Sequence, residues 1–225
     1  MEINETAYRM IIGELQMNSV TLVAVSKTKT ISAIKKLYDL GQKDFGENYV
    51  QELADKYAQL PPDIRWHFIG HLQTNKVKQL AAFVQLIHAV DSLKLLNEIN
   101  KEGKKNGRVI ECLLQVHLSK EETKFGLDEK ELEEIISDFK KSAFENVKIS
   151  GLMGMASFTN DMKIVGGEFR YLKSLFDKFS QQQTVNYKLQ ILSMGMSSDY
   201  KIAIEEGSNM VRIGSLIFGE RKKKG

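Results

Sequence analysis

The apolar residues of this chain follow two alternating spacings from one end to the other. Short runs of aliphatic and aromatic residues predict buried β-strands, and longer segments with apolar residues three or four positions apart predict amphipathic helices. The strands are expected at 20–26, 43–47, 66–70, 84–90, 109–118, 147–152, 189–193 and 209–213. The helices are expected at 3–17, 31–40, 49–60, 74–82, 91–106, 129–140, 161–181 and 198–206.

This alternation predicts an α/β protein built as a single (β/α)₈ TIM barrel with an extra N-terminal helix. The length of 225 residues suits a compact barrel, and no Pro/Gly/Ser-rich linker divides it, so residues 1–225 are expected to form one domain. The alternative is an open doubly wound sheet, which more often carries a glycine-rich fingerprint after its first strand. Ser26-Lys27-Thr28-Lys29 is not such a fingerprint, and the barrel is therefore favoured.

The composition argues against several classes of binding partner and of site. The net charge is +3 with acidic and basic residues interspersed, which gives no footprint for a nucleic acid. The basic cluster at 221–225 is expected to be a flexible tail. Cys112 is the single cysteine and lies in an apolar run, so neither a disulfide framework nor a cysteine metal site is expected. With no signal peptide and no apolar run near 18 residues, a cytoplasmic protein without membrane contact is expected.

Residues able to do chemistry follow several of the expected strands. In a parallel barrel the carboxyl ends of the strands meet at one face, where functional groups gather. Lys27 ends the first strand, and an amine held against apolar walls is a nucleophile that forms a Schiff base with a carbonyl. Its alternative role is a strand cap that points into water. Asn48 follows the second strand, at the same face.

The last two strand ends suggest a phosphate site. Phosphates in barrels often bind at the loops after strands seven and eight. Gly214 lets the backbone approach an anion, Ser215 adds a hydroxyl, and Ser197 donates from the neighbouring loop. Alternatively, Ser197 is only a helix N-cap and Gly214 only a tight turn. Arg212 interrupts an apolar strand, so it must either pair with a carboxylate or face a polar ligand in the barrel mouth.

Histidines and methionines are weaker candidates. Two histidines lie within strands, where a hydrogen-bonded core position is the usual outcome, and the spacing of the other two does not give helical metal-ligand geometry. No metal site is therefore expected. The methionines near two strand ends line either an apolar cleft for a flat ligand or the core. These residues are His88 and His117, His67 and His71, and Met153, Met155, Met194 and Met196.

With these residues assembled, the chain resembles the pyridoxal 5′-phosphate homeostasis family, which is itself similar to the barrel domain of bacterial alanine racemase. Six motifs carry the resemblance in order over almost the whole chain. They are Ala24-Val-Ser-Lys-Thr28, Phe45-Gly-Glu-Asn-Tyr-Val-Gln-Glu52, Trp66-His-Phe-Ile-Gly-His-Leu-Gln-Thr-Asn-Lys76, Gly151-Leu-Met153, Met194-Gly-Met-Ser-Ser-Asp199 and Val211-Arg-Ile-Gly-Ser-Leu-Ile-Phe-Gly219.

The resemblance implies a cofactor and a role for each candidate. It implies that Lys27 holds pyridoxal 5′-phosphate as a Schiff base, with Asn48 beside it. It implies that Arg212 faces the pyridine nitrogen. Ser197, together with Gly214-Ser215, would hold the phosphate.

The chemistry of the implied cofactor also indicates whether the protein is a catalyst. An arginine opposite the ring nitrogen disfavours its protonation, which makes the ring a weaker electron sink. Alanine racemase adds a second base, a tyrosine from another subunit's C-terminal domain, and this sequence is expected to lack such a domain. A non-catalytic monomeric carrier is therefore expected, acting in vitamin B6 and amino-acid homeostasis and delivering the cofactor to apo-enzymes. The alternatives are a cofactor-dependent amino-acid racemase or lyase, and a barrel that binds another phosphorylated metabolite without covalent attachment.

Overall fold

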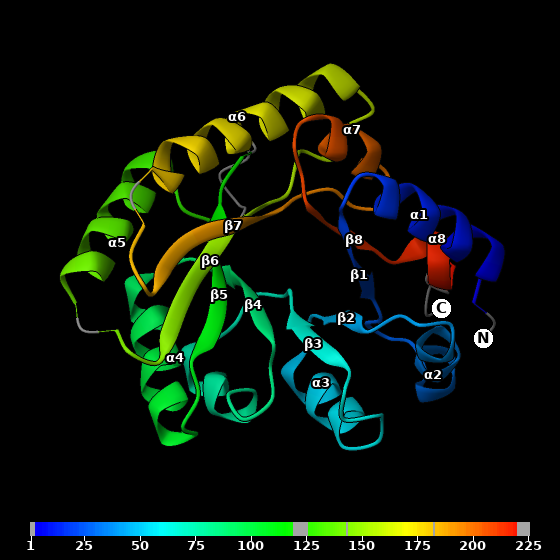
Figure 1. Ribbon diagram of the computed structural model, residues 1–225, viewed down its shortest axis with the longest axis horizontal. Coiled ribbons are helices and arrows are strands. Elements are labelled where there is room, and N and C mark those ends of the chain that lie inside the picture. Colours follow the sequence, from blue (N-terminus) through cyan, green and yellow to red (C-terminus); the bar gives the residue numbers. More distant parts are fainter. Residues whose placement is uncertain (1–2, 119–125, 143, 182, 220–225) are drawn as a thin grey trace.

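Eight parallel strands close into a barrel in which each strand pairs with the next along the chain (Figure 1). The computed structural model describes residues 3–118, 126–142, 144–181 and 183–219. Strand β1 pairs with β8 and closes the sheet, with Val23 opposite Arg212. The strands are β1 (Thr21–Val25), β2 (Asp44–Glu47), β3 (Arg65–Phe68), β4 (Leu86–Val90), β5 (Ile110–Val116), β6 (Val147–Gly154), β7 (Tyr187–Ser193) and β8 (Met210–Ile213). The predicted (β/α)₈ barrel is confirmed.

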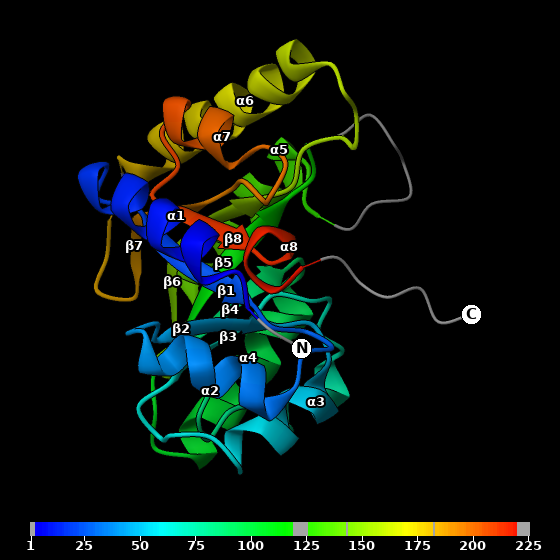
Figure 2. The ribbon, with the colours of Figure 1, turned by 90° about the vertical axis from the view of Figure 1, so that its right-hand side faces the viewer.

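Helices surround this barrel, and the expected N-terminal helix is present. The helices are α1 (Glu5–Met17), α2 (Ile31–Asp39), α3 (Val50–Tyr57), α4 (Leu93–Lys105), α5 (Glu129–Lys141), α6 (Met162–Ser180), α7 (Tyr200–Glu205) and α8 (Ser215–Phe218). Helix α1 begins after Asn4, whose side chain caps it and whose N–H donates to Ile217 O of α8 at 2.7 Å. The beginning and the end of the described chain therefore lie side by side (Figure 2).

The structure differs from the expected elements in three places. The segment expected to be a helix over 74–82 is a 3₁₀-helix, η1 (Thr74–Gln79), in which only Val77 is buried. Leu80 and Ala81 just beyond it are also buried, but the chain continues there as a turn and not as an α-helix. Helix α7 begins at Tyr200 with Asp199 as its N-cap, so Ser197 neither opens nor caps it. The one-turn helix α8 was not among the expected elements.

Two apolar clusters form the core. The larger one fills the space between the barrel and its helices and includes Cys112, whose burial was predicted. The smaller one lies inside the barrel and consists of Val23, Leu86, Ala89, Leu113, Met153 and Met210. Buried polar side chains also lie inside the barrel, and they extend from this smaller cluster to the carboxyl ends of the strands.

The chain has no candidate membrane span in its described part: none of those helices is both long and apolar enough to cross a bilayer. The expected tail at 221–225 lies outside the described residues.

Candidate functional site at the carboxyl end of the barrel

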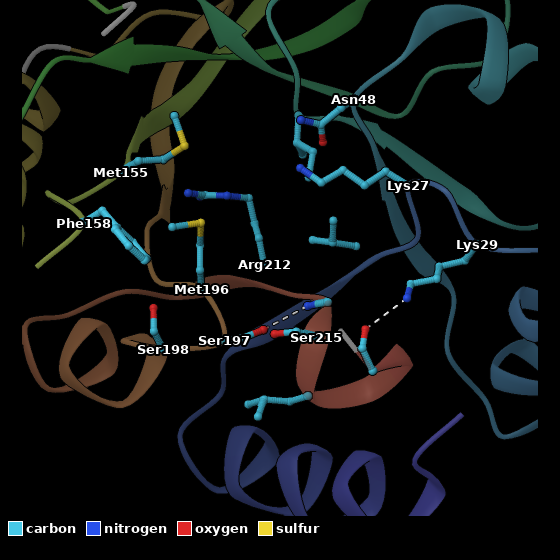
Figure 3. Close-up of a pocket in the computed structure, with 15 residues that line it drawn as sticks. Lys27, Lys29, Asn48, Met155, Phe158, Met196, Ser197, Ser198, Arg212 and Ser215 are labelled. Carbon is cyan, nitrogen blue, oxygen red and sulfur yellow. Dashed lines mark hydrogen bonds between the residues drawn. The ribbon is translucent and has the colours of Figure 1, made fainter. Parts of the chain in front are cut away.

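A cavity of about 490 Å³ opens where the strands end, and all six residues predicted from the sequence line it. Those six are Lys27, Asn48, Ser197, Arg212, Gly214 and Ser215. They come from the ends of β1, β2, β7 and β8, and the closed barrel brings these ends together. In Figure 3, the side chains of Lys27 and Arg212 reach into the space between the strand ends, with Ser197 and Ser215 near one another.

The turn after β1 places Lys27. Thr28 has the left-handed backbone angle φ = 64°, which is uncommon for a residue that is not glycine. Its N–H donates to Oε1 of Glu52 at 2.6 Å, and this bond fixes the strained turn. The Lys27 side chain is partly buried and projects from the turn into the cavity.

A buried ionic network supports this turn from behind. The Nζ of Lys56 donates to Ser26 O at 2.8 Å, and it lies 2.6 Å from Oε1 of both Glu47 and Glu52. The hydroxyl of Ser26 donates to the same Glu47 oxygen at 2.6 Å. Burial raises the pKa of Glu47, and the neighbouring Lys56 charge opposes that rise. Strands β1 and β2 are thus tied to α3 directly beneath Lys27.

Arg212 is buried in β8 and is held by oxygen atoms of the barrel wall. Its Nη1 donates to Ser193 O at 2.8 Å and to Ser193 Oγ at 2.7 Å, and its Nη2 donates to Gly154 O at 3.0 Å. These bonds use three of the five N–H groups of a guanidinium and leave two for a ligand. Burial lowers the pKa of Arg212 to about 10, against the opposing charge of Asp199, so the side chain is still a cation at neutral pH.

The predicted phosphate residues join the loops after β7 and β8. The N–H of Gly214 donates to Ser197 Oγ at 3.2 Å, which brings the two loops together at the cavity wall. Gly195 adopts φ = +97°, and a Cβ there would lie 2.6 Å from Ala203 Cβ. Only glycine allows the chain to turn this sharply before Ser197.

Asn48 brings an unsatisfied polar atom to the cavity. Its Oδ1 is buried and has no hydrogen-bond partner. A buried polar atom without a partner costs free energy, and a bound ligand is one way to satisfy it. Gly70 lets the backbone of Asn48 approach, because a Cβ at Gly70 would lie 2.4 Å from Asn48 O.

Several lining residues escaped the sequence analysis as site residues. Lys29 is one of them, and its Nζ donates to Phe218 O and Gly219 O at 3.0 Å each. The other lining residues are Val25, Ile69, Phe158, Ser198, Leu216 and Gly219. Val25 and Ile69 gave no signal because apolar residues at strand ends look like core. Ser198 was expected only as the first residue of a helix, and the remaining three lie in loops or in α8, where no strand or helix pattern was recognised. Of the four methionines considered, Met155 and Met196 line the cavity, whereas Met153 and Met194 belong to the core.

His88 has the buried core position expected of it, whereas His117, also expected there, follows β5 and is only partly buried. His67 and His88 are buried and bonded to each other, and His71 lies 3.4 Å from an Asp91 oxygen on the surface. Within the described ranges, no group of three potential metal ligands comes together.

Comparison with known proteins defines the class. Residues 8–222 match the family described as alanine racemase, N-terminal domain. The alanine racemase of Clostridium difficile 630 superposes with a TM-score of 0.75 at 15% identity, covering 99% of this chain and 59% of that one. At this identity the likeness concerns the fold alone. The chain is therefore a barrel of the alanine racemase N-terminal class.

Two relatives place it more narrowly. The pyridoxal phosphate homeostasis protein of Aquifex aeolicus is 44% identical over 206 residues, 91% of this chain and 89% of the relative. PipY of Synechococcus elongatus PCC7942, solved with pyridoxal phosphate bound, has a TM-score of 0.85 and 34% identity and covers 95% of this chain and 99% of its own. The chain belongs to the family of pyridoxal phosphate homeostasis proteins, and the resemblance drawn from its six motifs is confirmed.

Proposed function

We propose that this protein binds pyridoxal 5′-phosphate as a Schiff base on Lys27 and acts in intracellular vitamin B6 and amino-acid homeostasis. One observation carries the proposal: the amine, the guanidinium of Arg212 and the Ser197–Gly214 pair surround a single cavity. Each is the kind of group that one part of the cofactor requires. The bound cofactor of PipY and the names of the curated relatives support the same assignment.

The residues present fit this cofactor. When bound, it supplies an aldehyde, a pyridine ring and a phosphate. Lys27 would hold the aldehyde end, and the two remaining N–H groups of Arg212 would face the ring nitrogen. The hydroxyls of Ser197 and Ser215 would hold the phosphate through individual donors, because α8 is only one turn long. The Gly214 N–H, which donates to Ser197 Oγ, would turn to the phosphate. The unpartnered Oδ1 of Asn48 would find a partner beside the Schiff base.

The lining of the cavity favours a carrier over a catalyst. Among the described residues that line it, none has a carboxylate, imidazole, phenol or thiol that could act as a second acid or base opposite Lys27. The other lining amine, on Lys29, is engaged with two backbone carbonyls. The cationic Arg212 facing the ring nitrogen would also weaken the ring as an electron acceptor.

A carrier also needs a cellular location, an oligomeric state and recipients for its cofactor. We infer a cytoplasmic monomer that buffers free pyridoxal 5′-phosphate and passes it to apo forms of enzymes that use it. The alternative that remains is an amino-acid racemase or lyase using the same cofactor.

Chemical trapping tests the Schiff base. The loaded protein is reduced with borohydride and mapped by peptide mass spectrometry, and the adduct is expected on Lys27. The Lys27→Ala variant should stay folded and lose the visible absorbance of the bound cofactor, because it removes a cavity residue rather than core volume. The matched control is Lys35→Ala, which removes an exposed lysine paired with Asp39 on α2 and should keep the band. An adduct on Lys29, or an undiminished band in Lys27→Ala, would contradict the assignment.

Incubation with amino acids separates the carrier from the enzyme. The loaded protein is mixed with L-alanine and with L-serine, and the enantiomers are resolved by chiral chromatography over many molar equivalents. We expect no sustained exchange. Multiple turnovers that disappear in Lys27→Ala would establish the racemase alternative instead.

A further inference from the structure

A chain of buried polar side chains crosses the interior of the barrel behind Arg212. The Oγ of Ser193 on β7 lies 2.7 Å from Nη1 of Arg212 and 3.2 Å from Nδ1 of His88 on β4. The Nε2 of His88 lies 2.9 Å from Nδ1 of His67 on β3, whose Nε2 lies 3.0 Å from Oδ1 of Asp44 on β2. We call Asp44, His67, His88 and Ser193 the interior relay.

The two ends of the interior relay fix the direction of its hydrogen bonds. A guanidinium can only donate, so Ser193 Oγ accepts from Arg212 and its own hydrogen is left for His88 Nδ1. His88 then carries its hydrogen on Nε2 and donates it to His67 Nδ1. His67 in turn carries its hydrogen on Nε2 and donates to Asp44, whose carboxylate can only accept.

The opposite direction does not satisfy the same atoms. With hydrogens on both Nδ1 atoms, the neutral His67 would turn an Nε2 lone pair towards the Asp44 carboxylate. The hydroxyl hydrogen of Ser193 would then have no acceptor among its neighbours. Burial, the largest effect, lowers the pKa of His88 well below its usual value, and the Arg212 cation acts in the same direction, so this ring is neutral. The neutral direction from Arg212 to Asp44 is the one that pairs every donor.

The far end of the interior relay is anchored at the amino end of the barrel. Arg65 donates to both carboxylate oxygens of Asp44, at 2.7 Å through Nε and at 2.5 Å through Nη2. These bonds and that of His67 lower the pKa of Asp44 although its burial raises it. The acceptor at this end is therefore a fixed anion, and the relay has one stable direction.

We propose that the four residues of the interior relay are positioning residues that hold the Arg212 guanidinium in register with the ring nitrogen of the cofactor. This positioning role rests on the proposed function, whereas the direction of the hydrogen bonds in the interior relay does not. The Ser193 hydroxyl is one of the three acceptors of Arg212, and the other two are the backbone oxygens of Ser193 and Gly154. The relay therefore determines whether the N–H bonded to this hydroxyl stays on the barrel wall or turns to the cavity.

Binding of pyridoxal 5′-phosphate to two serine variants tests the positioning role. Ser193→Ala removes one acceptor from a buried cation, and we expect its affinity for the cofactor to fall about tenfold, the usual size for a hydrogen bond to a charged group. The matched control is Ser150→Ala, which removes another buried strand hydroxyl, bonded to Glu111 at 2.7 Å and not to Arg212. The control should bind within about twofold of the wild type, because the coupling between residues that are not in contact is small. Equal affinity of Ser193→Ala and the wild type would overturn the proposal.

Substitutions at His88 provide a rescue. His88→Asn keeps an oxygen acceptor near the position of Nδ1 and should retain affinity close to that of the wild type. His88→Leu keeps the apolar volume but removes that acceptor, and it should bind about as weakly as Ser193→Ala. If the Leu variant does not fold, the serine pair still decides the matter. Identical affinity of the folded Leu and Asn variants would contradict the role of the relay.

Nitrogen-15 NMR of the cofactor-free protein tests the direction itself. We expect Nε2 of both His67 and His88 to carry a hydrogen, and Nδ1 of His88 to carry none, at pH 7.5. A hydrogen on Nδ1 of His88, or a protonated His88 ring, would overturn the proposed direction even if the cofactor binds. Failure of the wild type to bind the cofactor would instead defeat the proposed function and leave the tautomers as measured.

Discussion

Lys27 and Arg212 reach one cavity by different physical routes. Lys27 stands on an irregular turn and its amine is partly solvated, whereas Arg212 is buried within a regular strand and depends on protein oxygen atoms. The sequence could predict both residues, because an amine at a strand end and a cation within an apolar strand are each unusual. It could not predict that Ser193 holds Arg212, because a serine at a strand end has many ordinary roles. Ser193 is identified as the partner of Arg212 only in the structure, where β7 and β8 are neighbours.

His88 should make the stability of the protein depend on pH. Its pKa in the folded state is lowered by burial, by His67 and by Arg212, so below about pH 6.5 only the unfolded chain takes up this proton. The contribution of the neutral ring is therefore complete above about pH 6.5 and is lost as the pH falls towards the folded pKa. We expect the wild type to lose up to about 1.4 kcal/mol of unfolding free energy per pH unit relative to His88→Asn.

Urea unfolding at pH 7.5, 6.5 and 5.5 measures this difference. The control is Ser150→Ala, which removes a buried hydroxyl and no histidine, and its curve should run parallel to that of the wild type. Parallel curves for the wild type and His88→Asn would show that the His88 ring takes up its proton in the folded state as readily as in the unfolded chain.

At the scale of elements, the apolar runs were sufficient to place all eight strands within a few residues. They failed for η1, where the buried Val77, Leu80 and Ala81 have helical spacing but the chain forms a 3₁₀-helix followed by a turn, and for the loop before α7. Ser197 precedes a helix and looks like a cap, but its hydroxyl accepts from Gly214 on the next loop. Its partner is 17 residues away in sequence, so no local pattern could have shown it.

The ionic network around Lys56 also joins residues that are distant in sequence. Loss of its cation should lower the stability of the protein strongly. Lys56→Met should cost about 3 kcal/mol or more, because it leaves the fully buried Glu47 carboxylate without its cation. The double variant Glu47→Gln/Lys56→Met should be more stable than Lys56→Met alone, since the unpaired charge is then gone. Urea unfolding of the three proteins measures both effects. A double variant less stable than the single one would show that the pair stabilises the fold by more than mutual neutralisation.

At the scale of the whole molecule, closure of the sheet makes the site depend on every part of the chain. Strand β1 pairs with β8, and the backbone of Asn4 bonds to that of Ile217, so Lys27 and Arg212 are held together only when both ends of the chain are folded. This arrangement leaves no sub-barrel that could keep the cavity intact. We therefore propose that residues 1–225 unfold as one domain, and that a bound cofactor stabilises all of it at once.

Denaturation with and without pyridoxal 5′-phosphate tests this idea. Fluorescence of Trp66, the single and buried tryptophan, reports on β3, whereas far-ultraviolet circular dichroism reports on all elements. We expect coincident transitions, with midpoints independent of protein concentration as the proposed monomer requires. At a free cofactor concentration of 100 times Kd, both should shift together by about 2.7 kcal/mol, and neither should shift in this way in Lys27→Ala. A cofactor that moved only one of the two transitions would mean that the cavity belongs to a part of the barrel able to fold by itself, and the closed sheet would then not be the unit that holds the site together.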